Sequence, residues 1–466
     1  MTQPQQGTRS LESLGRVHFI GIGGVGMSAV ARIMVARGIP VSGSDAKSLP
    51  VMDDLAAAGA RIAVGYTPGN LGDAQTVVAG SAIRPDNPEL AAARAAGLPV
   101  LHRSEALAAT MADDTVVAVA GTHGKSTTTS MITVLLQGAG LDPSFAIGAN
   151  VPALGVNAAH GTAGIFVAEA DESDGSFLNY RPVIAVVTNV EPDHLDFYGT
   201  AEAVYASFDS FTALLPADGV LVACADDPGA RALAERTLAR GNTRVVLYGT
   251  AADAAIRLHD AEPGQVEIST TAGTFGVELQ VPGRHNALNA AAAFAVAIEL
   301  GVAPETAAAA LAHFSGASRR FEFKGEGRGV RVYDDYAHHP TEVRAALSAA
   351  RAVAGQHKVH VLFQPHLFSR TREFAREFAE ALNTADTALV LDIYPAREDP
   401  IPGVTSGLIA EHLGSGGRLV GPGGDAVQAL LADAGPGDIV LTAGAGDVTA
   451  YGPLIVDALT IEAAGA

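Results

Sequence analysis

The chain has a single cysteine among its 466 residues, which excludes an internal disulfide and a zinc site built from cysteine thiolates. We expect this residue, Cys224, to be buried as a small apolar side chain. Basic residues are also scarce. The chain has 30 Lys and Arg against 50 Asp and Glu, a formal net charge of −20. Binding along nucleic acid requires a basic face, so this balance argues against nucleic-acid partners.

Long hydrophobic runs are missing as well. No stretch reaches the roughly 18 apolar residues of a membrane-spanning helix. The N-terminal segment 1–10 is polar and lacks the apolar centre of a signal peptide. The longest apolar run, AAAAFAVAI at 290–298, predicts a buried helix. We therefore expect a soluble, cytoplasmic protein without membrane insertion.

The composition that remains is globular, with 48% hydrophobic and 17% charged residues. At roughly 150 residues per domain, the length predicts about three domains. Short apolar runs alternate with alanine-rich stretches of helical character along most of the chain. The clearest strand candidates are 17–22, 76–80, 116–121, 164–170, 183–190, 360–365, 388–394 and 439–446.

Apolar runs of this kind, bounded by glycine and separated by helices, predict an α/β fold with parallel sheets covered on both faces. Two seams, near 102–114 and 315–329, divide the chain into domains at 1–112, 113–323 and 324–466. Ligands of such folds bind at the carboxyl ends of the strands. The polar motifs described below each follow a predicted strand.

The first motif is a glycine turn after the strand at 17–22. Gly21, Gly23 and Gly26 precede a predicted helix, and Asp45 follows about 20 residues beyond, after a second strand. Glycines let a ligand approach the backbone closely, and the helix N-terminus offers amides to a diphosphate. Both NAD and a UDP-sugar carry such a diphosphate, and a ligand-free turn is the plain structural alternative.

The second motif, VAVAGTHGKSTTTSM at 117–131, is a shortened phosphate-binding loop. The common form is G-x-x-x-x-G-K-[ST], which would place the first glycine at position 119, where this chain has valine. The first glycine is Gly121 instead. Loop amides and Lys125 can still hold phosphates, and the Ser126 hydroxyl can bind Mg²⁺. A helix is predicted over 125–137, with Gly138 at its C-terminal end.

Two acidic segments follow neighbouring strands of the same domain. Their oxygen atoms suit Mg²⁺, which prefers carboxylates and water. A single acidic residue there would be a cap or a solvated charge, but two clusters favour a metal site. The candidates are Glu169 in the first segment and Asn189, Glu191, Asp193, His194 and Asp196 in the second.

Three motifs together resemble the Mur ligase family of peptidoglycan precursor enzymes, whose loop has the same shortened form. They are GTHGKSTTT (121–129), EADESD (169–174) and NVEPDHLD (189–196). The resemblance covers nearly the whole chain and continues through 282–290, 318–322, 333–340, 363–371 and 441–447. It implies a Rossmann-like UDP-binding domain, a central P-loop ATPase-like domain and a C-terminal Rossmann-like domain that binds the amino acid.

Within the family, the segments 21–28, 81–89 and 334–340 most resemble the branch that adds the first residue of the stem peptide. That branch joins L-alanine to the lactyl carboxylate of UDP-N-acetylmuramate in peptidoglycan biosynthesis, through an acyl phosphate formed from ATP. Related ligases that add later residues carry a carbamoylated lysine 14 residues after the histidine of DHLD. Phe208 stands there, as the alanine-adding branch implies. Leu367 occupies a position where many relatives have arginine.

The resemblance also implies a role for each candidate residue. ATP would be held by Gly121, Thr122, His123, Gly124, Lys125, Ser126, Thr127, Asn286, Asn289, Arg320 and Asp335. Mg²⁺ would be bound by Ser126, Glu169 and His194, although an imidazole is an unusual magnesium ligand. The reacting groups would be contacted by Lys125, Glu169, His194, His338 and Arg370. The UDP half would be bound by Gly23, Gly24, Gly26, Asp45 and Ser81.

Three alternatives stay open at this stage. One is a ligase that attaches a preformed tripeptide to UDP-N-acetylmuramate during wall recycling. The second is an NAD-dependent oxidoreductase that uses the first glycine turn, and the third is a non-catalytic nucleotide-binding regulator. The oxidoreductase leaves the loop at 121–127 and both acidic segments unexplained. The expected partners are small molecules, and the protein is expected to be a monomer or homodimer.

Overall fold

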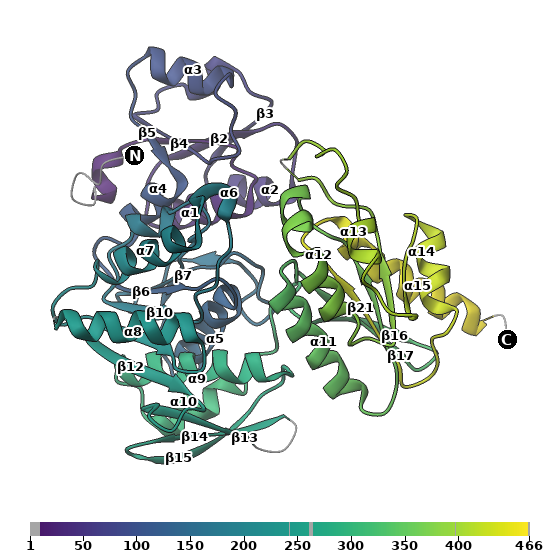
Figure 1. The fold of residues 1–466 in the computed structure, drawn as a ribbon. Helices are drawn as coiled ribbons and strands as arrows, with labels where there is room; N and C mark the ends of the chain where they lie inside the picture. The colour runs from purple at the N-terminus through teal and green to yellow at the C-terminus, as the bar shows by residue number, and fades with distance from the viewer. Residues whose placement is uncertain (1–9, 242, 261–263, 397, 465–466) are drawn as a thin grey trace. The chain divides into compact units, whose positions relative to one another are not determined.

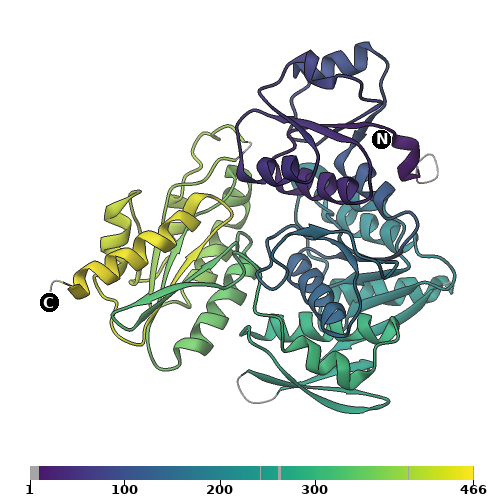
Figure 2. The same ribbon diagram turned by 180° about the vertical axis from the view of Figure 1, so that it is seen from behind.

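The structure, a computed structural model, describes residues 10–241, 243–260, 264–396 and 398–464 (Figures 1 and 2). It divides into two compact units. The first comprises Met1–Glu278 and Leu288–Phe314, and the second comprises Leu279–Ala287 and Ser315–Ala466. Across the described ranges, no helix has both the length and the apolar character needed to cross a membrane.

The first unit begins with a parallel five-stranded sheet in the order β3-β2-β1-β4-β5. Its strands are β1 (Val17–Ile20), β2 (Val41–Asp45), β3 (Arg61–Val64), β4 (Thr76–Ala79) and β5 (Val100–His102). Its helices are η1 (Leu11–Leu14), α1 (Val25–Ala36), α2 (Pro50–Ala57), η2 (Pro68–Leu71), α3 (Pro88–Ala95) and α4 (Arg103–Thr110). The strand order reverses between β1 and β4, which is where ligands of doubly wound sheets bind.

A ten-stranded sheet forms the rest of the first unit, in the order β15-β14-β13-β12-β11-β10-β6-β9-β7-β8. Its strands are β6 (Thr115–Ala120), β7 (Ser144–Ala146), β8 (Ala158–Ala159), β9 (Ile165–Glu169), β10 (Ile184–Val187), β11 (Val220–Cys224), β12 (Arg244–Gly249), β13 (Ile256–Asp260), β14 (Gln265–Thr270) and β15 (Gly273–Glu278). The associated helices are α5 (Lys125–Gly138), η3 (Ser176–Asn179), α6 (Leu195–Tyr198), α7 (Ala201–Thr212), α8 (Pro228–Arg240), α9 (Arg284–Glu299) and α10 (Pro304–Leu311).

The second unit contains a six-stranded sheet in the order β16-β17-β21-β18-β19-β20. Its strands are β16 (Glu322–Gly327), β17 (Val330–Asp335), β18 (Val359–Phe363), β19 (Thr387–Val390), β20 (Gly417–Leu419) and β21 (Ile439–Ala443). Its helices are α11 (Pro340–Ala354), α12 (Phe368–Leu382), α13 (Gly407–Ala410), α14 (Gly424–Leu431), η4 (Asp447–Ala450) and α15 (Tyr451–Ala464).

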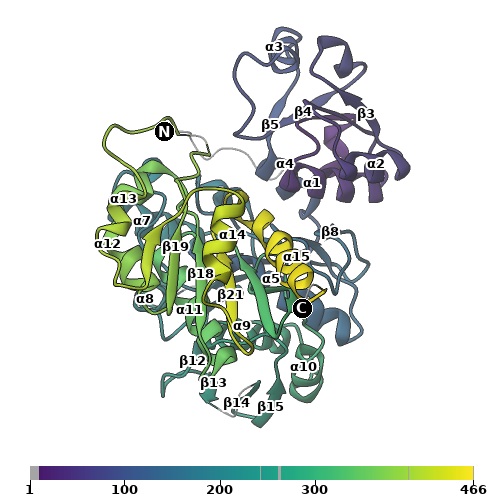
Figure 3. The ribbon, with the colours of Figure 1, turned by 90° about the vertical axis from the view of Figure 1, so that its right-hand side faces the viewer.

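Strand β18 shows why apolar runs specify this architecture. Successive side chains of a strand point to opposite faces. Val361 and Phe363 pack in one core with α11 and α12, whereas Leu362 packs in another with α14 and α15, which lie in front of the sheet in Figure 3. Because helices cover both faces, both sets of side chains must be apolar, and the strand reads as a continuous hydrophobic run.

The structure confirms the predicted α/β class, and each predicted strand overlaps an observed one. The run at 290–298 lies within α9, where Ala290 to Ala297 are at most 1% exposed, and Cys224 is buried. The central sheet is mixed rather than purely parallel, because β8, β14 and β15 pair antiparallel. The domain limits 1–112, 113–323 and 324–466 stay a prediction.

One helix end differs from the prediction. Gly138 is the last residue of α5 and not the residue after it, and the left-handed glycine beyond the helix is Gly140, with φ 83°. Gly138 has a packing role, since a Cβ on it would lie 2.9 Å from Ala310 Cβ. The absence of a side chain at position 138 therefore lets α5 and α10 approach closely.

Candidate active site

The shortened loop and both acidic segments follow three adjacent strands. β6 lies between β10 and β9, and all three run parallel. Ala120 of β6 is level with Val187 of β10, and Val119 is level with Glu169 of β9. The segments that continue from these residues therefore emerge at one edge of the sheet, as predicted.

Two glycines of the loop have no room for a side chain. Gly121 has φ 139°, and a Cβ on it would lie 2.0 Å from Thr188 Oγ1. Gly124 is left-handed, with φ 83°, and a Cβ there would lie 2.9 Å from Asn289 Oδ1. The loop is thus pressed against the end of β10 and against α9, which places the predicted ATP ligand Asn289 beside the loop.

Side chains that follow β10 fasten this loop in place. Asn189 accepts a hydrogen bond from the His123 amide at 2.7 Å and donates one to the His123 carbonyl at 3.0 Å. Thr122 Oγ1 accepts from the Glu191 amide at 2.9 Å. The polar atoms of Asn189, a candidate metal ligand in the sequence, are therefore engaged with the loop backbone.

The Lys125 ammonium is the cation of the loop, and its side chain is 14% exposed. Its Nζ donates to the carbonyl oxygens of Gly121 and Thr122 at 2.7 and 3.2 Å, and to Glu172 Oε1 at 2.8 Å. Burial alone would lower the pKa of Lys125, but the carboxylates of Glu172 and Asp171 outweigh it and raise the pKa above its ordinary value. Lys125 is consequently protonated and positioned as a charge for phosphate.

Ser126 and Glu169 form the oxygen pair that the sequence predicted for Mg²⁺. Ser126 Oγ donates to Glu169 Oε1 at 3.1 Å, and Glu169 Oε2 accepts from the Gly148 amide at 2.8 Å. A hydroxyl and a carboxylate at this separation are hard oxygen donors, the class that Mg²⁺ prefers. The residues therefore fit the predicted ion.

His194 lies on the neighbouring segment in a left-handed conformation, with φ 56°. Its Nε2 is 3.7 Å from Glu172 Oε1 and 3.7 Å from Asp193 Oδ2. The predicted pairing of His194 with Glu169 around a second ion stays a prediction. The side chain of Asp196 lies outside the described part of the structure.

Sequence reasoning missed Glu172 as a member of this site. Its side chain is 2% exposed, and its backbone carbonyl accepts a hydrogen bond from the Tyr198 hydroxyl at 2.5 Å. Burial raises the pKa of Glu172 to about 7, against the opposing effect of the Lys125 ammonium. The signal was present in the motif EADESD, but three acidic residues after a strand do not show which one faces the loop.

The first glycine turn is held by its own acidic residue. The Gly23 amide donates to Asp45 Oδ2 at 3.0 Å, so the predicted pair is in contact. Ser81, which follows β4, donates to Asp174 Oδ2 at 3.3 Å and lies 3.0 Å from His102 Nε2. The glycine turn and Ser81 therefore follow the adjacent strands β1 and β4, where the strand order reverses.

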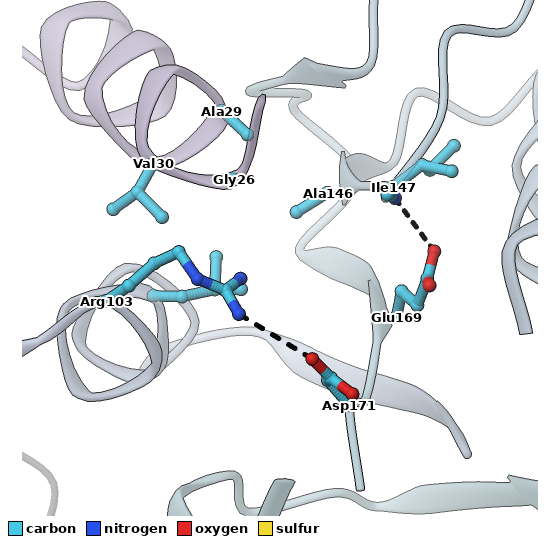
Figure 4. Close-up of a pocket in the computed structure, with 10 residues that line it drawn as sticks. Gly26, Ala29, Val30, Arg103, Ala146, Ile147, Glu169 and Asp171 are labelled. Atoms are coloured by element: carbon cyan, nitrogen blue, oxygen red, sulfur yellow. Dashed lines mark hydrogen bonds and ion pairs between the residues drawn. The ribbon is translucent and has the colours of Figure 1, made fainter. Parts of the chain in front are cut away.

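A cavity of about 80 Å³ in the first unit is lined by residues of the helices α1 and α4 and by residues in or just after the strands β7 and β9 (Figure 4). Its lining includes Gly26, at the glycine turn, and Glu169, of the predicted metal pair. Arg103 also lines it, with Nη2 4.0 Å from Asp171 Oδ2. A Cβ on Gly26 would lie 2.9 Å from Arg103 Cδ, so the absence of a side chain at position 26 makes room for this arginine.

The second unit holds the remaining predicted residues. Asn286 donates to the Pro282 carbonyl at 2.7 Å, and the Arg320 guanidinium lies 5.2 Å from the centre of the Tyr336 ring. His338 Nδ1 is 3.2 Å from Glu342 Oε2. Their roles toward ATP stay predictions.

Two further residues of this unit have defined surroundings. Asp335 accepts from the amides of Phe321 and Ala337 at 2.8 Å each, and burial raises its pKa to about 6, opposed by Arg320. Arg370 is buried on α12, three residues after Leu367. Leu367 itself is buried with φ 70°, an uncommon backbone conformation for leucine.

Phe208 occupies the position where related ligases carry a carbamoylated lysine. It is fully buried, and its ring meets the Phe177 ring edge-on at 5.5 Å between centroids. The position is therefore part of an apolar core and supplies no metal ligand.

Family models match most of the chain. Residues 16–115 match the Mur ligase family catalytic domain, residues 119–297 the Mur ligase middle domain, and residues 319–446 the Mur ligase glutamate ligase domain. The chain is 82% identical over 465 residues to the UDP-N-acetylmuramate–L-alanine ligase of Arthrobacter sp. (strain FB24), covering 100% of this chain and 99% of the relative. It is 79% identical to the ligase of the same name from Paenarthrobacter aurescens (strain TC1), covering 96% and 98%.

Solved structures agree with this assignment. The UDP-N-acetylmuramate-alanine ligase MurC of Thermotoga maritima superposes with a TM-score of 0.77 at 28% identity, covering 95% of this chain and 98% of that one. The murein peptide ligase of Psychrobacter arcticus superposes with a TM-score of 0.69 at 27% identity, covering 96% and 98%. Both likenesses extend over all three sheets.

Proposed function

Because the chain belongs to the Mur ligase family, we propose that it joins L-alanine to the lactyl carboxylate of UDP-N-acetylmuramate at the expense of ATP, in peptidoglycan synthesis. The predicted family, three-part α/β architecture and ligase class are thereby confirmed. The observation that carries the chemistry is the convergence of Lys125, Ser126 and Glu169 at the ends of β6 and β9.

The reaction must activate a carboxylate, which is a poor electrophile in water. The lactyl carboxylate oxygen attacks the γ-phosphorus of ATP, the bond to the β-phosphate oxygen breaks, and ADP leaves. The neutral amine of L-alanine then attacks the acyl carbon, inorganic phosphate leaves with the acyl oxygen, and the amine gives up a proton. Phosphoryl transfer of this kind relies on positioning and charge stabilisation.

The residues of the first unit supply that positioning. The protonated Lys125 neutralises the β- and γ-phosphates, while loop amides between Gly121 and Ser126 bind their oxygens. Ser126 and Glu169 would hold Mg²⁺, which when bound would act as a template and charge clamp. Asn289, beside Gly124, is positioned to contact the nucleotide.

The sugar nucleotide would extend from the first glycine turn toward Glu169. The cavity between Gly26 and Glu169 connects these regions, and Arg103 is its cation. A guanidinium binds carboxylate and phosphate oxygens through a planar fork of donors. We assign Arg103 to an anionic group of UDP-N-acetylmuramate. Binding energy from the distant UDP half can then fix the reacting carboxylate.

A substrate panel tests this function and separates it from the recycling ligase. The purified protein is incubated with ATP, Mg²⁺, UDP-N-acetylmuramate and either L-alanine, glycine, L-serine or the tripeptide. ADP release should be fastest with L-alanine, and added hydroxylamine should trap the acyl phosphate as a hydroxamate. Preference for the tripeptide would favour the recycling ligase, and nicotinamide reduction without ATP use would favour the oxidoreductase. We further propose that the reaction takes place in the cytoplasm, and the monomer or homodimer stays a prediction.

A further inference from the structure

Glu172 connects two residues that the proposed reaction uses. Its Oε1 lies 2.8 Å from Lys125 Nζ and 3.7 Å from His194 Nε2, within the first unit. The segment that carries it is held by the Tyr198 hydroxyl, which donates to the Glu172 carbonyl. The carboxylate is therefore fixed between the loop lysine and the histidine of the second acidic segment.

The second oxygen of this carboxylate has a different environment. Oε2 is buried and has no hydrogen-bond partner within the described part of the chain. A buried acceptor without a donor is costly, so such groups in native proteins call for an explanation. This oxygen of Glu172 is therefore an acceptor that only a donor from outside the described residues would satisfy.

The donors of Lys125 are already committed. Its ammonium has three N–H groups, and three oxygens lie within reach: the carbonyls of Gly121 and Thr122 and the carboxylate of Glu172. A phosphate that is to contact Lys125 must displace at least one of these. Glu172 is the strongest competitor, because it is charged and a phosphate is a like charge beside it.

We propose that Glu172 is a positioning residue that couples ATP binding to Mg²⁺, because its carboxylate retains Lys125 until a magnesium-neutralised triphosphate replaces it. The inference rests on the proposed function for the identity of the nucleotide. Without the ion, the triphosphate meets the carboxylates of Glu172, Glu169 and Asp171 around one ammonium. With the ion, that repulsion falls, and the nucleotide can take the place of Glu172 on Lys125.

The test compares ATP binding with Mg²⁺ and with excess chelator by calorimetry, in the wild-type protein and in Glu172→Gln. The amide keeps the shape of the side chain but removes its charge. Glu172→Gln should bind magnesium-free ATP about tenfold more tightly than the wild type, the order expected when the phosphate no longer has to displace a charged hydrogen-bond partner from Lys125. The ratio of the ATP affinity with Mg²⁺ to the ATP affinity with excess chelator should fall by the same factor.

Two controls give the result its meaning. Glu202→Gln removes the same charge from an exposed position in the first turn of α7 and should leave the ratio unchanged. Placing Glu172→Gln in a Lys125→Met background should abolish most of the gain, because the lysine is no longer there to be released. A merely structural role would not produce this dependence on Lys125.

Equal or weaker binding of magnesium-free ATP by Glu172→Gln, in a protein that melts at the wild-type temperature, would overturn the proposal. If that variant does not fold, Glu172→Asp serves instead. It keeps the charge but withdraws it from Lys125, and it should lower the ratio to a smaller extent. An unchanged ratio there contradicts the coupling. Since binding is measured without an acceptor substrate, these outcomes are independent of the substrate panel.

Discussion

After β1, the glycine turn presents the Gly23 amide to the Asp45 carboxylate, whereas after β6 the turn surrounds the Lys125 ammonium. Both turns join a parallel strand to a helix in the same unit. The backbone plan alone therefore makes a place for phosphate. The side chains decide the function of each turn. The first turn can bind the diphosphate of a substrate and fix its position, and the second can stabilise a phosphoryl group during its transfer.

The largest expected effect removes the charge that distinguishes the second turn. Lys125→Ala should lower the turnover number roughly 10²–10³-fold, the order measured when one preorganised transition-state donor is lost. Steady-state ADP release measures it. Lys358→Ala, an exposed lysine of the second unit, should retain the wild-type rate. A Lys125→Ala protein with undiminished turnover would break the comparison.

Next in size is a contrast between one glycine of each turn. Gly121→Ala forces a Cβ to within 2.0 Å of Thr188 Oγ1, at φ 139°. We expect a loss of about 3 kcal/mol of stability, together with weakened ATP binding. In Gly24→Ala the new Cβ would have its nearest neighbour at 3.5 Å, an ordinary contact. Thermal unfolding should show a lowered midpoint for the first variant only. Equal midpoints would contradict the packing argument.

Arg103→Ala should weaken substrate binding at the first turn and leave nucleotide binding at the second turn unchanged. Loss of its guanidinium from the cavity should raise the KM for UDP-N-acetylmuramate about tenfold, equivalent to about 1.4 kcal/mol, and leave the KM for ATP unchanged. Arg103→Lys should restore only part of the loss, because an ammonium lacks the planar fork. A rise in the KM for ATP alone would contradict the assignment of Arg103 to UDP-N-acetylmuramate.

The smallest expected effect is the contribution of His102, the last residue of β5 in the five-stranded sheet, to the pH dependence of stability. Burial lowers the pKa of His102 below its ordinary value of 6.5, although Asp174 opposes this. Above that value the imidazole is neutral in both states, so it contributes nothing. As the pH falls through 6.5, the unfolded chain takes up the proton first, and stability is lost. His102→Gln should therefore show a smaller fall in the unfolding midpoint on acidification. A steeper fall would reverse the sign of the argument.

The sequence was sufficient to predict the strands that are buried on both faces of a sheet. The runs around Val117, Val186 and Val361 are apolar on both faces because helices cover both faces, so they were readable as strands. The antiparallel β14 and β15 contain no such continuous run and were missed: Val266 and Ile268 of β14 alternate with polar residues, and β15 includes two glycines, Gly273 and Gly276.

The same limit applies to the candidate site. The positions of Lys125, Ser126 and Glu169 follow from strand ends, and the structure brings them together. The choice between Asp171 and Glu172 as the partner of Lys125 could not be made, since the chain after Glu169 has no strand periodicity to say which side chain turns inward. Arg103 was missed for another reason. It begins a helix near a predicted seam, and its cavity depends on residues distant in sequence.

Asn189, which bonds to both backbone polar groups of His123, has one more consequence. Fixing the backbone of a mobile residue costs roughly 1–2 kcal/mol in conformational entropy. Folding itself has already ordered these residues through Asn189, Thr188 and Thr122, so nucleotide association does not bear that cost. The shortened loop is preorganised, and its brevity is the reason that so few side chains suffice to keep it so.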